Sequence, residues 1–369
     1  MLGVRTATIY AYASRGLLGG TAQGPGRKAR YSRVLVETLR LKAAARAGHA
    51  AVAATALRWG EPVMDSAVTQ LTPRGPVYRG QRAIDLVGST FEAVAELLWQ
   101  RKAAWTTVAP RVATKTQRPS VHSLLDVMVG LAPSLRTAPL EACASVIRRL
   151  ACAGGTHEVL AERQASVAAA LGASLRGTAL NSKDQRLLDA GLVLIADHEL
   201  NASTFAARIA TAAGARWPQA FIAALATATG ARHAAACDGA EQLWQKVRAS
   251  PQWLEDQLAQ GAPLAGFDAG AYPDGDPRGD KLIALIQPRL GAPEHRRLNE
   301  LLSAVRARTG QFPSVDLGLS LLAHALGFPA GSASVIFVVG RTAGWVAHIE
   351  EQAASGEPIR PRARSVRSG

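Results

Sequence analysis

Cysteine and histidine are the side chains most often used for metal binding and nucleophilic catalysis, and this chain has three cysteines and eight histidines. Cys143, Cys152 and Cys237 share no metal-ligand spacing with one another or with the histidines, and an odd, sparse set does not describe a disulfide framework. We therefore predict no metal site, no disulfides and a reducing cytoplasm. Cys237 has no histidine or acid at a diagnostic spacing, so we interpret it as a small buried apolar residue.

The acid–base side chains each have an ordinary structural interpretation. Asp316 follows Pro313 and Ser314 at a predicted helix start, where aspartate is favoured as a cap or first-turn residue. His233 lies between two apolar helical runs, where a histidine is usually a satisfied core or surface residue.

The arginines that could bind an anion are equally ambiguous one at a time. Arg278 follows a Pro-Asp-Gly-Asp-Pro turn and Arg360 lies in a basic tail, and both would ordinarily be solvated charges. A catalytic role for any of these residues depends on whether the fold brings them together.

The elements that must position these residues are predicted to be helices. Hydrophobic residues make up 48% of the chain but aromatic residues only 5%, and Ala, Leu and Val carry the apolar content. Between residues 50 and 225 the helical segments are separated by turn residues, and 77–99 is predicted to be an amphipathic helix after a turn. Residues 194–215 are predicted to be one long helical stretch carrying Asp197, His198 and Glu199. The fold class is therefore all-α.

Five stretches follow one another in an order that is itself informative. They are VYRGQRAIDLVGSTFEAVAELLW (77–99), LIADHELNASTFAARIATAAGA (194–215), GARHAAACDGAEQLW around His233, GFDAGAYPDGDPR (266–278), and FPSVDLGLSLLAHALGFP through VVGRTAGWVAHIEEQ to PIRPRAR (312–364). In this order the stretches resemble the citrate synthase superfamily over nearly all of the chain beyond residue 50. The resemblance implies a helical large domain at 47–225 and 326–369, a small domain at 226–325, and a homodimer whose sites use residues of both subunits.

The resemblance also implies a reaction and roles for particular residues. The family joins the methyl carbon of acetyl-CoA to the ketone of oxaloacetate and then hydrolyses the thioester, a reaction of the tricarboxylic acid cycle that needs a carboxylate base, an enolate-stabilising donor and several cations. Asp316 matches the base and His233 the enol-stabilising histidine. The residues that match the keto-acid ligands are His198, Arg278, Arg341 and, from the other subunit, Arg360. No cofactor is implied, since acyl-CoA is a substrate.

Two departures bear on catalysis. The family pattern Gly-Phe-Gly-His is Gly266-Phe267-Asp268-Ala269 here, so Ala269 replaces a histidine that protonates or polarises the ketone. Losing a general acid typically costs about 10²- to 10⁴-fold in rate. The Gly-Gly pair that follows the family histidine is replaced by alanines after His233, and each added methyl group would tighten the pocket near the thioester.

The first 46 residues form a basic segment with nine basic residues and one acid, and they carry +8 of the net charge of +14. We predict a helix at 5–18, a Gly/Pro-rich and basic loop, and a helix at 32–48. This unit resembles the winged helix-turn-helix heads of mercury-resistance regulators and excisionases, which begin with one more helix, so the head is expected to be truncated. The candidate DNA contacts are Arg5, Thr8, Arg27, Lys28 and Arg30. The alternative is a basic arm that packs on its own domain or on a partner subunit.

Three functions follow. The first is a citrate- or methylcitrate-synthase-like acyltransferase, impaired by Ala269. The second is a catalytically degenerate ligand sensor associated with DNA, and the third is a heterodimer partner of an active citrate synthase.

No run of about 18 uninterrupted apolar residues exists, and the signal-peptide pattern is absent, so we predict a cytoplasmic protein without a membrane partner.

Overall fold

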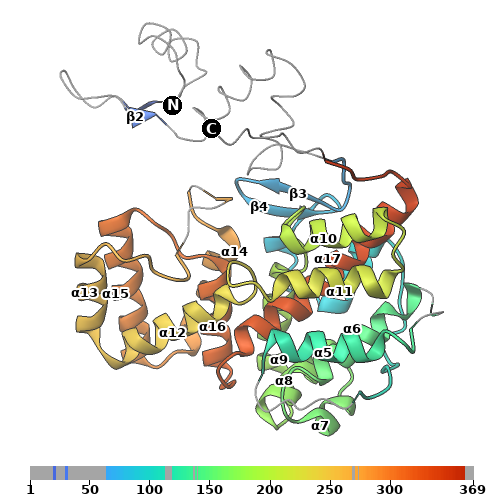
Figure 1. Cartoon of the computed structure of the whole chain (residues 1–369). Coiled ribbons are helices and arrows are strands. Elements are labelled where there is room, and N and C mark those ends of the chain that lie inside the picture. The colour runs from blue at the N-terminus through green and yellow to red at the C-terminus, as the bar shows by residue number, and fades with distance from the viewer. Residues whose placement is uncertain are drawn as a thin grey trace, which may run out of the picture. The chain divides into compact units, whose positions relative to one another are not determined.

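The computed structural model describes Gly20–Thr21, Arg30–Tyr31 and residues 64–361, except 113–118, 136–137, 139, 268–270 and 273 (Figure 1). The chain divides into two compact units, one made of Met1–Asp65 and Arg360–Gly369 and the other of Ser66–Ile359.

In the first unit, β1 (Gly20–Thr21) pairs antiparallel with β2 (Arg30–Tyr31). The prediction placed a loop across these residues, whereas the structure pairs its two ends. The predicted helices at 5–18 and 32–48 lie outside the described residues.

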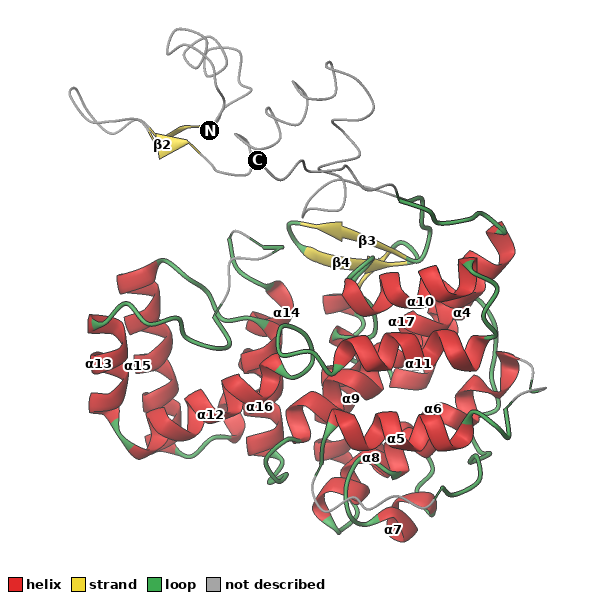
Figure 2. Cartoon of the chain, viewed as in Figure 1, coloured by secondary structure: helices red, strands yellow, loops and turns green. Residues whose placement is uncertain are grey.

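The second unit is built almost entirely of helices, which confirms the all-α prediction (Figure 2). Its helices are α4 (Phe91–Trp99), α5 (Val121–Leu131), α6 (Cys143–Cys152), α7 (Glu158–Glu162), α8 (Val167–Arg176), α9 (Ser182–Leu194), α10 (Ala202–Ala212), α11 (Trp217–Ala228), α12 (Ala236–Ala249), α13 (Pro251–Ala259), α14 (Pro277–Ile286), α15 (Ala292–Thr309), α16 (Val315–Ala325) and α17 (Ser332–Ser355). Short 3₁₀ turns occur at η1 (Ala83–Asp85), η2 (Leu140–Ala142) and η3 (Gln287–Arg289).

Local sequence explains where many of these helices begin. A short polar side chain at the N-cap accepts a hydrogen bond from a backbone N–H of the first turn, which would otherwise have no partner. The residues that cap in this way are Thr90, Ser120, Ser166, Asn181, Asn201, Ser250, Asp276 and Ser314.

A small antiparallel sheet was not predicted. Strands β3 (Thr69–Thr72), β4 (Gly75–Tyr78) and β5 (Gln81–Arg82) pair in the order β3-β4-β5. The segment 77–99 is therefore strand, 3₁₀ turn and helix, and its helix begins only at Phe91, because Thr90 caps it there. Gly75 allows the tight turn between the first two strands, since its φ of 100° is strained for other residues.

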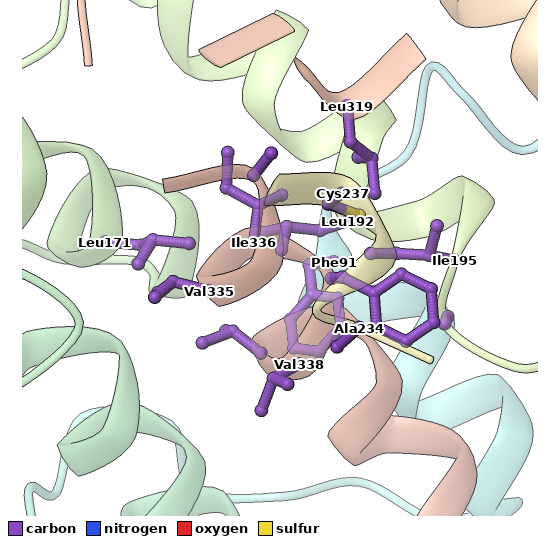
Figure 3. Close-up of a cluster of buried hydrophobic side chains, with 14 of the residues drawn as sticks. Phe91, Leu171, Leu192, Ile195, Ala234, Cys237, Leu319, Val335, Ile336 and Val338 are labelled. Atoms are coloured by element: carbon purple, nitrogen blue, oxygen red, sulfur yellow. The ribbon is translucent and has the colours of Figure 1, made fainter. Parts of the chain in front are cut away.

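The core of the unit surrounds α17. Nineteen of its 24 residues are buried, and Figure 3 shows side chains of α17 among residues of other helices, including Leu192, Cys237 and Leu319. Among the helices of the described residues, only α17 is long enough and apolar enough in composition to cross a membrane. Its most apolar window is wholly buried inside the protein, which is the environment of a core helix.

Helices α12 to α16 lie together on one side of the unit, and α4 to α11 lie on the other (Figures 1 and 2). Helix α17 packs against both groups, including α10, α4 and α16. The predicted domain boundaries at 225/226 and 325/326 stay a prediction.

Candidate active site

Five predicted site residues come from five different places in the second unit. His198 lies between α9 and α10, His233 immediately before α12, Arg278 in the first turn of α14, Asp316 in the first turn of α16, and Arg341 within α17. The fold brings them together: both arginines and His233 act electrostatically on His198, and Arg278 acts on Asp316.

The loop that carries His198 was predicted to be helical, and this prediction is wrong. Helix α9 ends at Leu194 and α10 begins only at Ala202, because Asn201 caps the new helix and Glu199 adopts a left-handed φ of 54°. The Tyr78 hydroxyl lies 3.1 Å to 3.2 Å from the carbonyl oxygens of Val193, Leu194 and Asp197, so its one proton supplies a donor to this group of carbonyls where the helix is broken.

A buried hydrogen bond fixes the same loop from the side of α17. The Asp197 carboxylate lies 3.1 Å from Nε2 of His348, and neither side chain is exposed. Burial raises the pKa of Asp197, but the contact with His348 and the charge of Arg341 act in the other direction, and the pKa is lowered overall. Gly344 allows this close approach, since a Cβ there would lie 2.2 Å from Oδ1 of Asp197. The loop before His198 is therefore held on both sides.

Tyr272 is a site residue that the sequence analysis missed. Its hydroxyl lies 2.8 Å from Nε2 of His198, and the two rings meet edge to face. Burial lowers the pKa of His198 well below its ordinary value, and the positive charges of Arg278 and Arg341 lower it further. His198 is therefore neutral, and with Tyr272 it forms a pair of uncharged hydrogen-bonding groups beside two cations. Tyr272 lies in the stretch 266–278, but its pairing with a residue 74 positions away has no signal in sequence.

Arg278 is clamped rather than solvated. Its Nε and Nη2 donate to the two oxygens of Asp276 at 3.0 Å and 2.8 Å, and both side chains are nearly inaccessible. Asp276 also caps α14 and accepts from the backbone N–H of Val315, so one carboxylate links Arg278 to the start of α16. Burial lowers the pKa of Arg278, but Asp276 more than offsets this, and the group stays charged.

Arg341 is the opposite case. It is 2% exposed, its Nε donates to the carbonyl of Ile195 at 2.9 Å, and its buried Nη1 has no hydrogen-bond partner. Among the described residues no carboxylate forms an ion pair with it. Burial lowers its pKa to about 10, and the charge of Arg278 adds to the effect although Asp197 opposes it. A buried cation that has a free N–H and no carboxylate in direct contact among the described residues is the arrangement expected for binding an anionic ligand.

His233 is held by Ser203, whose hydroxyl oxygen lies 2.7 Å from Nε2 of the imidazole. The indole N–H of Trp345 donates to the same oxygen at 3.0 Å, and the hydroxyl also lies 2.7 Å from Oδ1 of Asn201. Asn201 Oδ1 can only accept, so the single proton of the Ser203 hydroxyl goes to Asn201, and Ser203 accepts a hydrogen bond from Nε2–H of the neutral His233 ring. Burial lowers the pKa of His233 to about 4, and Arg341 lowers it further, so the ring is neutral at pH 7.

Asp316 lies at the start of α16, as predicted. Ser314 caps the helix through the N–H of Asp316, and the Ser314 hydroxyl lies 3.1 Å from Oδ2 of the same residue. Burial raises the pKa of Asp316, against the lowering effects of a Cys237 hydrogen bond and the charge of Arg278. A carboxylate with a raised pKa is a stronger base than a solvated one.

Cys237 is buried, as predicted, but its interpretation as merely apolar is wrong. Its sulfur lies 3.4 Å from Oδ1 of Asp316, although the two residues are 79 positions apart. Helices α12 and α16 pack against each other and create this contact.

The remaining predicted positions are not placed in this site. Ala269, Arg5, Thr8, Arg27 and Lys28 lie outside the described residues, and of Arg30 only the backbone is described. Arg360 is exposed and belongs to the first unit, so its role in a partner's site stays a prediction. No group of three or more His, Cys, Asp or Glu side chains suited to a metal ion occurs among the described residues.

This arrangement combines two functions in one place. Two buried guanidinium groups can bind a ligand that carries carboxylates, and a carboxylate and two neutral imidazoles can move a proton beside it. Each part comes from a separate helix terminus or helix.

The stretch of chain that carries these residues matches one family of known proteins. The family model for the citrate synthase C-terminal domain matches residues 136–362, more than half of the chain. Citrate synthase of Mycolicibacterium smegmatis is 34% identical over 183 residues, 48% of this chain and 49% of that protein. The 2-methylcitrate synthase 2 of Corynebacterium glutamicum is 30% identical over 190 residues, 50% of each chain. The chain thus matches about half the length of these curated relatives.

Solved structures show the same fold. Citrate synthase from Thermotoga maritima superposes with a TM-score of 0.70 at 21% identity, over 84% of this chain and 94% of that one. The Thermoplasma acidophilum enzyme, solved with carboxymethyl coenzyme A and oxaloacetate, gives a TM-score of 0.71 at 21% identity over the same shares. With the family model covering more than half of its length, the chain belongs to the citrate synthase family.

Proposed function

We propose that the protein is an acyltransferase that condenses a short acyl-CoA, such as acetyl-CoA, with a 2-oxo dicarboxylic acid such as oxaloacetate. The observation that carries the proposal is the state of Arg341. This arginine is buried and forms no ion pair with a carboxylate among the described residues, and its positive charge lowers the pKa of both His198 and His233.

Binding of the keto acid uses the two arginines in different ways. Arg341 can offer its unbonded Nη1 and its charge to one carboxylate of the ligand. Arg278 is already aligned by Asp276, so it presents a fixed positive charge without having to reorganise when the ligand arrives. A dianionic ligand would therefore remove the electrostatic penalty of holding two like charges in one buried site.

Proton abstraction is assigned to Asp316. The carboxylate takes a proton from the carbon next to the thioester carbonyl, and the thioester oxygen becomes an enol or enolate oxygen. Neutral His233 donates to that oxygen once the ring proton is on Nδ1, which requires the Ser203 hydroxyl to turn from Oδ1 of Asn201 to Nε2 of the ring. A neutral imidazole at pH 7 fits this role, since its proton stays on the donor atom rather than being lost or gained.

Carbon–carbon bond formation follows at the ketone. The enol carbon attacks the keto carbon, the ketone oxygen takes up a proton, and water then hydrolyses the thioester to a tricarboxylic acid and free CoA. With Ala269 in place of the family histidine, His198 and Tyr272 are the neutral groups assigned to hydrogen-bond the ketone oxygen. Turnover is expected to be slower than in a relative with the histidine, by about 10²- to 10⁴-fold if no other group compensates.

We further propose that the enzyme acts as a homodimer in which Arg360 reaches the partner's site, and that it works in the cytoplasm. The alternative of a DNA-associated regulator gains no support, since its candidate contacts lie outside the described residues apart from the backbone of Arg30.

Mass spectrometry of the products tests the proposal. Methyl-labelled acetyl-CoA and oxaloacetate, incubated with purified protein, should yield a labelled tricarboxylic acid, and propionyl-CoA should yield its methyl homologue if the pocket admits it. Binding of oxaloacetate by calorimetry without any product would contradict the catalytic assignment and leave only ligand binding.

A further inference from the structure

The thiol of Cys237 contacts the proposed base directly. Cys237 is fully buried near the start of α12, and its sulfur lies 3.4 Å from Oδ1 of Asp316 (Figure 3 shows its buried surroundings). The other oxygen, Oδ2, lies 3.1 Å from the Ser314 hydroxyl. Each oxygen of the carboxylate therefore has one side-chain donor of its own.

A second contact fixes the two helices at the same point. The hydroxyl of Ser320 lies 3.0 Å from the carbonyl oxygen of Cys237 and 2.8 Å from that of Asp316. The backbone that carries the thiol is thus linked to the backbone that carries the carboxylate, so the distance between sulfur and oxygen does not depend on side-chain packing alone.

The charges around the carboxylate come from two elements besides its own. Helix α14 with its cap places Arg278 and Asp276 near Asp316, with opposite effects on its charge. Helix α12 contributes Cys237, which itself faces the negative charges of Asp316 first and then of Asp238 and Glu241. Burial and these charges raise the pKa of the thiol well above its ordinary value, so it stays protonated and able to donate.

We propose that Cys237 is a positioning residue for catalysis, whose thiol donates a hydrogen bond to Oδ1 of Asp316 and holds the carboxylate in the orientation and charge state of a base. The inference rests on the proposed condensation. A thiol suits the position because it is a weak donor. It restrains the carboxylate without lowering its basicity as much as a hydroxyl or amide would.

The pH dependence of kcat/KM separates this role from simple packing. Removing a donor to the charged form raises the pKa of the carboxyl group. In Cys237→Ala the acid limb of the profile should therefore move to higher pH, by about half a unit to one unit for a hydrogen bond of ordinary strength. In Cys237→Ser, which keeps a donor, the limb should stay or move to lower pH. Cys152→Ala is the matched control, since it empties a buried thiol position in α6 and should leave the limb in place.

Infrared spectroscopy gives a readout that needs no activity. The S–H stretching band of Cys237, identified by its loss in Cys237→Ser, should lie at the lower frequency of a hydrogen-bonded thiol and should shift upward in Asp316→Ala. An S–H band that does not shift in Asp316→Ala would overturn the proposal. A Cys237→Ala variant with a lower maximal kcat/KM but an acid limb at the wild-type pH would also overturn it. If the wild-type protein showed no condensation, the proposed function would fail, while the infrared result would still decide whether the thiol holds the carboxylate.

Discussion

Replacement of Arg341 by methionine should make the protein more stable and, at the same time, unable to hold its ligand. The pKa of this arginine is lowered from 12.5 to about 10 by burial, so at any pH below about 10 the charged form is disfavoured in the fold relative to the unfolded chain. At 1.36 kcal/mol per pKa unit, the charge costs about 3 kcal/mol of stability at pH 7. Against this, Arg341→Met loses the hydrogen bond to the Ile195 carbonyl, worth about 1 to 2 kcal/mol when the carbonyl is left buried. The net expectation is a gain of about 1 to 2 kcal/mol.

Arg278→Met is the matched control, because this arginine has the same size and burial but a bidentate carboxylate partner. Removing it leaves Asp276 buried and without its counter-charge, which typically costs about 3 to 5 kcal/mol. The two substitutions are therefore expected to change stability in opposite directions.

Urea unfolding followed by tryptophan fluorescence measures both effects, and calorimetry with oxaloacetate measures the ligand. Loss of a buried, charge-assisted contact should weaken binding in Arg341→Met by about 3 kcal/mol, or roughly a hundredfold in Kd. Two results would refute the proposal that Arg341 binds an anionic ligand at a cost in stability. The first is an Arg341→Met variant that unfolds at a clearly lower urea concentration than the wild type, and the second is a variant that binds oxaloacetate as tightly as the wild type does.

Three further outcomes follow from the same site. Ser203→Ala should lower kcat by about tenfold or more with little change in KM for oxaloacetate, because His233 loses the hydroxyl that holds its ring at Nε2; an unchanged kcat would remove Ser203 from the mechanism. The His233 ring should show no titration by NMR between about pH 5 and 8, because its pKa is lowered to about 4 and a base is neutral above its pKa; a midpoint near the ordinary 6.5 would contradict its assigned neutral state. Ala269→His should raise turnover by about 10²- to 10⁴-fold, measured under saturating substrates, and no gain would show that the missing histidine is not what limits the reaction.

The order of motifs along the chain was sufficient to predict the family and the helical fold, and the five site residues that it proposed are ones that the fold brings together. Local rules also placed Asp316 correctly, because Ser314 caps the helix that carries it. The small sheet at 69–82 was missed because its strands are short and lie among segments that read as turns.

Contacts between distant residues account for the rest of what the sequence could not supply. The break before α10 depends on Tyr78, whose hydroxyl lies within hydrogen-bonding distance of backbone carbonyls more than a hundred positions away. Whether an arginine is solvated, clamped or unpaired depends equally on distant neighbours. Arg278 differs in that its partner, Asp276, is only two residues away, and the sequence favoured a solvated charge because the pairing depends on the geometry at the start of α14. The same limit hid the contact between Cys237 and Asp316.

Release of free thiol from acetyl-CoA tests the account most directly. A thiol-reactive dye should report CoA release that depends on oxaloacetate and disappears in Asp316→Ala, while that variant still binds oxaloacetate through Arg278 and Arg341. Thiol release that persists in Asp316→Ala, or that does not depend on oxaloacetate, would contradict the assignment of Asp316 as the base of a condensing enzyme.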